Sequence, residues 1–301
     1  YGEVAGVNKP ISRLALGTML EGTTFPRADA GVLFDDFYER GGNCFDTAHI
    51  YGTEPIFGDW LQKRGVREDV VVLVKGGHTP DCYPEAITRQ FLTSLERLKL
   101  DYADIYMMHR DNEEISVGEF IECLNEHVRA GRIRAFGGSN WSLKRVEEAN
   151  NYAREKGLQG FAAVSNNFSL ARMVDPIWAG SISTSDAESR AWLEKNQMPI
   201  FSWSSQARGF FARGDRNFTA DGELARCWYS DDNFERLERV QQMAKERGVT
   251  PISVAAAYVL SQPFPTFAII GPRAPWETRT SIDAFEVELS PEDVKWLNLE
   301  A

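Results

Sequence analysis

The sequence predicts one closed (β/α)8 barrel, the TIM-barrel fold, formed as a single domain by residues 1–301. Short apolar segments alternate with amphipathic helical segments almost from end to end, and this alternation requires parallel strands with right-handed crossovers. Polar residues directly follow several expected strands, where barrel active sites are assembled. An open doubly wound sheet is the competing fold, but the sequence has no G-x-G-x-x-G after a first strand and no linker between two halves.

The individual elements are expected from runs of apolar residues and from their spacing. The run Val70–Val74 is typical of a strand buried on both faces, and the segment from Pro84 has apolar residues at helical spacing. Ser116 and Glu119 form a capping-box pattern that predicts the start of another helix. Eight strands are expected in all, at Leu14–Gly17, Asn43–Phe45, Val70–Val74, Asp104–Met108, Ile133–Phe136, Phe161–Val164, Ile200–Ser202 and Phe267–Ile270.

One segment, residues 204–232 after the seventh strand, is rich in Gly, Arg and Asp and shows little periodicity. A structureless loop of this length is rare inside a compact domain unless it has a function. We therefore expect an active-site or cofactor-closing loop here.

Composition excludes several classes of protein. The formal net charge is −11, which disfavours nucleic acid as a partner. No apolar run approaches the roughly 20 residues that span a bilayer, and no signal peptide opens the sequence, so we expect a cytoplasmic protein without a membrane partner. The four cysteines are scattered and indicate reduced thiols, and the four histidines lack ligand spacing, so we expect no metal site.

Four polar or ionisable side chains are expected to meet at one mouth of the barrel. Asp46 and Tyr51 follow the second strand, Lys75 ends the third, and His109 ends the fourth. These residue types suit proton donation to a carbonyl oxygen: an ammonium tunes the phenol, a carboxylate holds the ammonium, and an imidazole orients the carbonyl.

Each of these residues also has a purely structural interpretation. Asp46 and Lys75 would form an ion pair inside the barrel, Tyr51 would be a rim aromatic, and His109 a core histidine bonded to backbone. Taken singly, each residue is equally compatible with the structural and the chemical interpretation. Their occurrence together on successive strand ends favours chemistry.

The sequence resembles the aldo-keto reductase superfamily over nearly its whole length. The similarity is carried by Phe45-Asp-Thr-Ala-His-Ile-Tyr-Gly52, the strand-end Lys75, Asp104-Ile-Tyr-Met-Met-His109 and Gly131-Arg-Ile-Arg-Ala-Phe-Gly-Gly-Ser-Asn140. The resemblance implies NAD(P)H-dependent reduction of an aldehyde or ketone, with Asp46, Tyr51, Lys75 and His109 as the catalytic tetrad.

The resemblance also implies a cofactor site. Its members would bind the nicotinamide, the pyrophosphate or the adenosine ribose: Thr18, Met19, Ser139, Asn140, Ser165, Trp203, Ser204, Gln206, Arg208, Gly209, Gly271, Arg273 and Arg279. The sequence departs from the family pattern at Ser165 and Phe168, where Gln and Tyr are frequent, at Ser281 in place of Asn, and at Gln206-Ala207 in place of Leu-Gly.

Cofactor preference and substrate are expected from fewer residues. Arg273 and Arg279 would clamp a ribose phosphate, which favours NADP(H) over NAD(H). His49, His78 and Trp141 are the candidate substrate contacts, with Trp178 in a similar loop position. The mixture of Trp with polar residues such as His49, His78 and Asn167 favours a sugar- or polyol-derived carbonyl.

Two other functions compete with the small-molecule reductase. One is a regulatory module of the same fold that binds the cofactor with negligible turnover. The other is a barrel with unrelated chemistry, such as a phosphate-ester lyase or isomerase.

Overall fold

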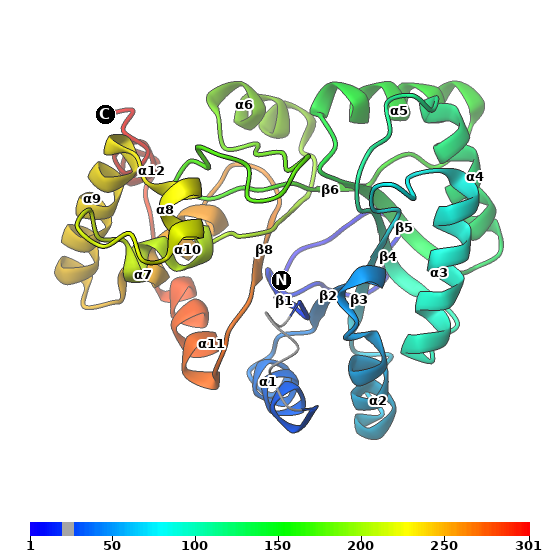
Figure 1. The fold of residues 1–301 in the computed structure, drawn as a ribbon, viewed down its shortest axis with the longest axis horizontal. Helices are drawn as coiled ribbons and strands as arrows, with labels where there is room; N and C mark the ends of the chain where they lie inside the picture. Colours follow the sequence, from blue (N-terminus) through cyan, green and yellow to red (C-terminus); the bar gives the residue numbers. More distant parts are fainter. Residues whose placement is uncertain (20–26) are drawn as a thin grey trace.

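The computed structural model describes residues 1–19 and 27–301, and it contains a closed barrel of eight parallel strands in the order β1 to β8 (Figure 1). Each strand pairs with its sequence neighbours, and β8 closes the barrel onto β1. The strands are β1 Leu14–Gly17, β2 Cys44–Ala48, β3 Val71–Gly76, β4 Ala103–Met108, β5 Ile133–Ser139, β6 Ala163–Ser165, β7 Ile200–Ser202 and β8 Thr266–Ile270. The predicted (β/α)8 barrel is therefore confirmed.

Helices surround the strands in the described part of the chain. They are α1 Arg27–Glu39, α2 Glu54–Arg64, α3 Pro84–Leu98, α4 Val117–Arg129, α5 Leu143–Lys156, α6 Ala187–Asn196, α7 Phe210–Arg213, α8 Gly222–Trp228, α9 Asp231–Arg247, α10 Pro251–Leu260, α11 Pro275–Ile282 and α12 Pro291–Leu297, with short 3₁₀ turns η1 His49–Tyr51, η2 Ala207–Gly209 and η3 Asp283–Glu286. Side chains cap many helix starts; the expected cap of α4 is present, where the Ser116 hydroxyl accepts a hydrogen bond from the Glu119 amide.

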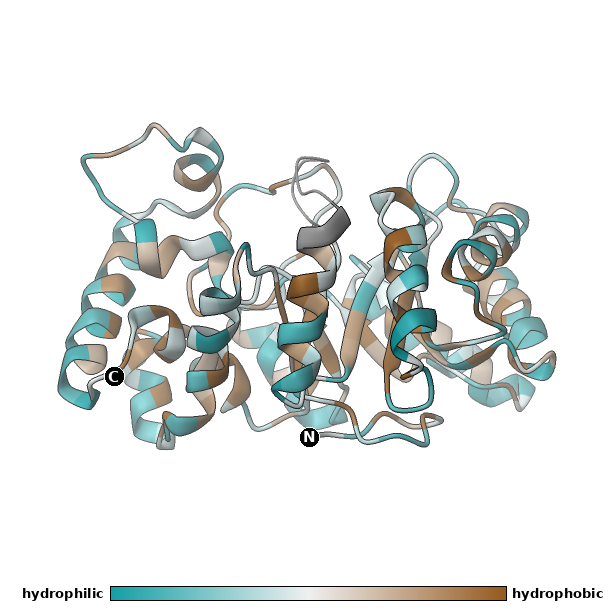
Figure 2. Ribbon diagram, turned by 90° about the horizontal axis from the view of Figure 1, so that it is seen from below, coloured by the Kyte–Doolittle hydropathy of each residue, from teal (hydrophilic) through white to brown (hydrophobic). Residues whose placement is uncertain are grey.

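Two hydrophobic cores hold the barrel. The larger lies between the strands and the helices, and the smaller fills the barrel interior with residues such as Leu73, Met107 and Phe201. Because side chains alternate along a strand, residues two positions apart face the same core. The N-terminal segment closes the lower end of the barrel in Figure 2, where Val4 and Ile11 join the interior core. The opposite end is left for a site.

The segment 204–232 is more regular than the expected loop. It contains η2, α7 and α8, and its last two residues begin α9. The hydrophobic side chains of Phe210, Phe211 and Leu224 are buried in the larger core, which explains why short helices form without a long amphipathic pattern.

Three further features concern the described residues only. No helix among them is long and apolar enough to cross a membrane. No group of three or more metal-binding side chains is found in the same residues. Cys44, Cys82, Cys123 and Cys227 are all free and buried.

The contact between β5 and β6 yields a stability prediction at Gly137. A Cβ at this position would overlap the carbonyl oxygen of Ala163 on β6 and lie 2.8 Å from Met107 Sδ. Gly137→Ala should therefore lower the free energy of unfolding by at least about 2 kcal/mol, measured by chemical denaturation. The matched control is Gly31→Ala in α1, where a Cβ meets nothing within 4 Å. An equal effect of the two variants would contradict this description of the contact.

Candidate active site

A cavity of about 660 Å³ opens at the carboxyl ends of the strands. Alternation along β2, β3 and β4 turns Asp46, Lys75 and His109 toward the interior, on the same side as Cys44, Leu73 and Met107. These three side chains and Tyr51 line the cavity together. The structure thus brings together the four residues that the sequence predicted to meet.

Asp46 and Lys75 form a buried ion pair at the floor of the cavity. Each is 3% exposed, and the Lys75 ammonium donates a hydrogen bond to Asp46 Oδ1. Burial raises the pKa of the Asp46 carboxyl, and the nearby ammonium opposes this rise without cancelling it. The pKa of Lys75 is raised: burial alone would lower it, but Asp46 and Tyr51 outweigh burial. Lys75 therefore stays cationic at neutral pH.

Tyr51 lies beside this pair on η1, the 3₁₀ turn directly after β2. The Lys75 ammonium is 5.1 Å from the centre of the Tyr51 ring. Burial raises the pKa of the phenol, and the Lys75 ammonium counteracts part of that rise. The phenol is consequently protonated at neutral pH and has a cation beside it that favours loss of the proton.

His109 is the neutral member of the group. Its ring meets the Tyr51 ring edge-on at 5.8 Å and the His78 ring at 5.0 Å between centroids. Burial, the Lys75 ammonium and the Arg110 guanidinium lower the pKa of His109 well below its usual value. Its Nδ1 is buried and finds no hydrogen-bond partner among the described residues. A neutral imidazole presents one donor and one acceptor nitrogen to its surroundings.

The next strand ends carry hydroxyl and amide groups. Ser139 and Ser165 are register partners at the ends of β5 and β6. Asn140 follows with a left-handed φ of 57°, and its amide donates to Ser139 Oγ at 3.1 Å. The Ser165 hydroxyl is buried and has no hydrogen-bond partner in the described part of the chain. Ser139 and Asn140 line the cavity, whereas Ser165 does not.

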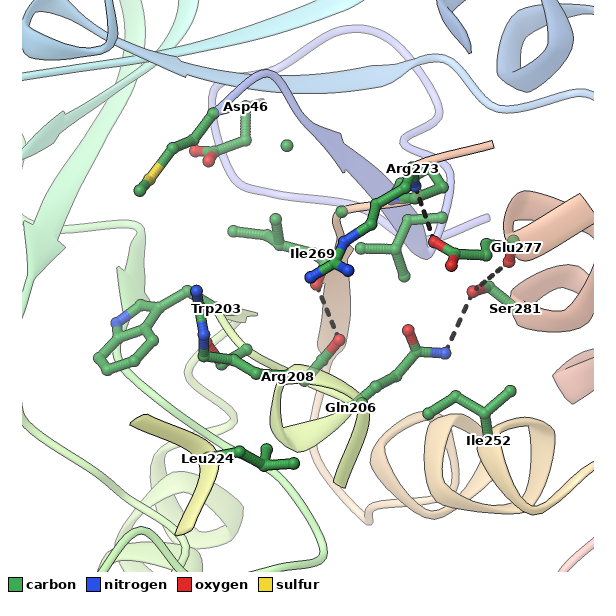
Figure 3. A pocket seen from close by; sticks show the side chains of 18 of the residues that line it. Asp46, Trp203, Gln206, Arg208, Leu224, Ile252, Ile269, Arg273, Glu277 and Ser281 are labelled. Atoms are coloured by element: carbon green, nitrogen blue, oxygen red, sulfur yellow. Dashed lines mark hydrogen bonds between the residues drawn. The ribbon is translucent and has the colours of Figure 1, made fainter. Parts of the chain in front are cut away.

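The segment after β7 forms a second wall of the cavity (Figure 3). Trp203 directly follows β7, and the chain then turns through Ser204 and Arg208 with left-handed φ values of 49° and 52°. Arg208 pairs with Glu223 of α8 at 3.0 Å. The expected contacts Ser204, Gln206, Arg208 and Gly209 all line the cavity.

The loop after β8 completes this wall. Gly271 and Arg273 line the cavity, and the Arg273 side chain points into it in Figure 3. The Arg273 amide donates to Glu277 Oε2 at 2.7 Å. Ser281, which stands in place of the frequent Asn, accepts a hydrogen bond from the Gln206 amide at 3.1 Å.

Several expected contacts lie away from the cavity. Trp141 is fully buried behind β5, packed on Phe120 and Phe161 at 5.8 and 5.0 Å, because the left-handed Asn140 turns the chain outward. His49 faces Ser94 and Arg97 of α3. These two are corrections to the predicted substrate contacts.

The remaining expected residues divide between the wall and its surroundings. Met19 lines the cavity, while the adjacent Thr18 is buried and shares a hydrogen bond with Thr53. His78 reaches the site only through its ring contact with His109. Arg279 is exposed on α11 and does not line the cavity.

The structure adds cavity residues that the sequence interpretation missed. Arg110 and Ser205 line the cavity, as do Asp221 and Glu223 of the segment after β7. Arg110 was detectable in principle because it directly follows His109 at a strand end. The acidic residues carry no pattern that distinguishes them from solvated surface.

The fold and these groups define a barrel protein with an acid–base site at the carboxyl ends of its strands. The chain belongs to the aldo/keto reductase family, whose sequence model matches residues 13–298. It is therefore an oxidoreductase of a family that reduces carbonyl groups of small molecules and uses nicotinamide cofactors.

Comparison with individual proteins places the chain among distant relatives. An uncharacterized oxidoreductase of Bacillus subtilis, YrpG, is 28% identical, covering 96% of this chain and 91% of its own length. Norsolorinic acid reductase stcV of Emericella nidulans is 28% identical, with coverages of 97% and 78%. An aryl-alcohol dehydrogenase [NADP(+)] of Phanerodontia chrysosporium is 26% identical, with coverages of 97% and 83%.

A solved structure supports the fold alone. The crystal structure of a thermostable aldo-keto reductase in complex with the inhibitor epalrestat superposes with a TM-score of 0.78 at 23% identity. It covers 100% of this chain and 99% of the other.

The Asp46–Lys75 pair predicts a pH-dependent loss of stability. In Lys75→Met the Asp46 carboxyl loses the opposing ammonium, so its folded-state pKa rises further above the unfolded value of about 3.9. The folded state then retains a proton that the unfolded state releases. The free energy of unfolding should therefore fall as pH rises from the unfolded-state pKa toward the raised folded-state pKa, by up to about 1.4 kcal/mol per pH unit.

The control is the double variant Lys75→Met/Asp46→Asn, which has no carboxyl to titrate. Denaturation curves at both ends of this pH range should give the double variant a slope close to that of the wild type. If both variants show the same slope, Asp46 is not the titrating group.

Proposed function

We propose that this protein is an NADPH-dependent reductase of aldehydes or ketones in which Tyr51 is the general acid. The observation that carries the proposal is the meeting of Tyr51, His109 and the buried Asp46–Lys75 pair at one barrel mouth. These groups come from three successive strand ends, and a purely structural ion pair requires neither the phenol nor the imidazole.

Each side chain has one task in this proposal. Tyr51 holds its proton at neutral pH and releases it to the carbonyl oxygen as negative charge develops there. Lys75 stabilises the resulting phenolate, and Asp46 keeps the ammonium charged and fixed in place. His109, being neutral, donates a hydrogen bond to the same oxygen without competing for the proton.

The residues at the ends of β5 to β8 fit a nicotinamide cofactor. Ser139 and Asn140 would bind the carboxamide, whose donor and acceptor match theirs. Trp203 would stack on the ring. Arg208, Gln206 and Arg273 would face the phosphates. The reduced cofactor, when bound, supplies hydride to the carbonyl carbon.

The residues of the cavity wall favour an aryl carbonyl substrate over the sugar-derived carbonyl expected from the sequence. The polar residues that favoured a sugar are not on the wall: His49 faces α3, and Asn167 is buried and bonded to the Trp203 carbonyl. The wall instead presents Met19, Trp178 and Trp203. Flat aromatic side chains favour an aromatic ligand.

Replacing Tyr51 tests the general acid. Tyr51→Phe keeps the ring and removes the proton, so NADPH binding should persist while turnover of a reactive aryl aldehyde falls about 10²–10⁴-fold. Binding is followed by fluorescence titration and turnover by NADPH absorbance. A loss smaller than tenfold would remove Tyr51 from this role.

Tyr106→Phe is the matched control, because the Tyr106 hydroxyl is buried, lies outside the cavity and has no hydrogen-bond partner among the described residues. It should keep nearly full activity. Wild-type protein that binds NADPH but fails multiple turnovers with every aldehyde would instead indicate the regulatory module.

Cofactor preference is tested at Arg273. The ribose phosphate of NADP carries about −1.5 to −2 charge, and a guanidinium at the wall would pair with it. Arg273→Ala should weaken NADPH binding at least about tenfold and NADH binding much less, measured by paired titrations. Equal weakening of both cofactors would contradict the NADPH preference. Arg279→Ala, on α11 outside the wall, shows whether the second arginine shares the phosphate.

A further inference from the structure

Arg110 is a buried arginine in the cavity wall that the proposed chemistry does not use. It follows His109 at the end of β4, is 6% exposed, and lines the cavity with Tyr51 and His109. Its Nη1 donates to the carbonyl oxygen of His109 at 3.0 Å. Within the described residues this is the one hydrogen bond that the guanidinium makes.

No carboxylate neutralises this guanidinium in the part of the chain that the structure describes. The adjacent Asp111 is engaged elsewhere, with Arg145 at 3.1 Å. The acidic groups close enough to affect the pKa of Arg110 are the Tyr51 phenol and the Cys82 thiol, which are both neutral at pH 7 because burial raises their pKa values.

Other cations of the cavity differ from Arg110. Lys75 pairs with Asp46. Arg208 and Arg213 pair with Glu223 and Asp221 at 3.0 and 3.5 Å. Arg273 is exposed on the loop after β8. Arg110 is therefore buried and, among the described residues, has no ion-pair partner.

A cation in this position favours an anion as its ligand. Taking a guanidinium out of water costs several kcal/mol unless an anion or several acceptors replace the lost hydration. One backbone carbonyl satisfies one of five donors. The cavity is the side from which a counter-ion can arrive, because Arg110 lines it.

The position of Arg110 also indicates that the anion belongs to the substrate. The guanidinium lowers the pKa values of both Tyr51 and His109, so it lies near the proposed carbonyl site. The loop after β6 covers it: a Cβ at Gly180 would lie 3.7 Å from Arg110 Nε, and Trp178 of the same loop lines the cavity. Trp178 in turn lies 5.9 Å from Trp203 between ring centroids. An aryl ring against Trp178 would therefore contact the same loop that covers the guanidinium.

We propose that Arg110 binds a carboxylate of the substrate, so that the protein prefers aryl aldehydes or ketones that carry a carboxylate group. This inference rests on the proposed reductase function. A guanidinium forms two parallel hydrogen bonds with a carboxylate, which orients the ligand as well as holding it.

The first experiment uses wild-type protein and two pairs of probes, and the members of each pair differ in one charge. NADPH consumption is measured with 3- and 4-carboxybenzaldehyde and with the methyl ester of each. The better acid should have a kcat/KM at least about tenfold above that of its ester, mainly through KM, as expected for a charged hydrogen bond. Equal values for acid and ester would overturn the proposal, whatever the behaviour of the variants.

The second experiment changes the cation. Arg110→Met should reduce kcat/KM for the acid at least about tenfold and for the ester less than about threefold, and Arg110→Lys should recover part of the loss. The matched control is Arg236→Met, an equally buried arginine in α9 that bonds Asn233 and Asn298. It should leave the ratio of acid to ester unchanged. Equal losses for acid and ester in Arg110→Met would indicate a structural residue.

A binding measurement separates this inference from the reductase assignment. Terephthalate, which has no aldehyde or ketone group to reduce, should raise the melting temperature of the wild type and not that of Arg110→Met in the presence of NADP. If no aldehyde is reduced but this difference is found, the reductase function fails and the carboxylate site stands. If aldehydes are reduced without the difference, the carboxylate site fails alone.

Discussion

The alternation of side chains along eight parallel strands is the constraint on which the site depends. Barrel closure points every second residue of a strand into a narrow interior. Cys44, Leu73 and Met107 fill one layer of that interior. Asp46, Lys75 and His109, two positions further along the same strands, must therefore lie in the next layer, at the mouth. A shift of one residue in β2, β3 or β4 would exchange an ionisable group for an apolar one. Core packing and the arrangement of the site are therefore set by the same register.

Burial then determines the charge state of each group. In water the Tyr51 phenol and the His109 imidazole would titrate with ordinary pKa values, but the interior separates them: the phenol holds its proton and the imidazole becomes neutral. The Asp46–Lys75 pair keeps one charge of each sign within this low-dielectric space. Removing either partner would leave a buried ionisable group without its counter-charge, which is why the pair affects stability and proposed chemistry together.

The strands and the four central residues were predictable because both follow from short-range patterns. An apolar run marks a strand, and the polar residue at its end must lie at the barrel mouth. Beyond the end of a strand, the alternation of side chains no longer predicts which way a residue points. Trp141 follows a left-handed residue and turns into the outer core, while His49 sits on a 3₁₀ turn that directs it to α3. The helices within 204–232 form through long-range burial of Phe210 and Leu224, which no local period encodes.

The overall charge of the protein makes the cations at the mouth more significant. A chain with a net charge of −11 repels anionic ligands at long range, so an anion can be held only where local cations outweigh that field. The cavity supplies them from separate strand ends: Arg208 after β7, Arg273 after β8 and Arg110 after β4. Arg208 is already paired with Glu223, so a phosphate there must compete with a carboxylate. Arg110 has no such competitor among the described residues, so an anion that reaches it gains the full interaction. The carboxylates that pair with these arginines thus distinguish two regions of the mouth. The region of Arg208 and Arg273 suits a large phosphorylated cofactor, and the region of Arg110 suits a small carboxylate.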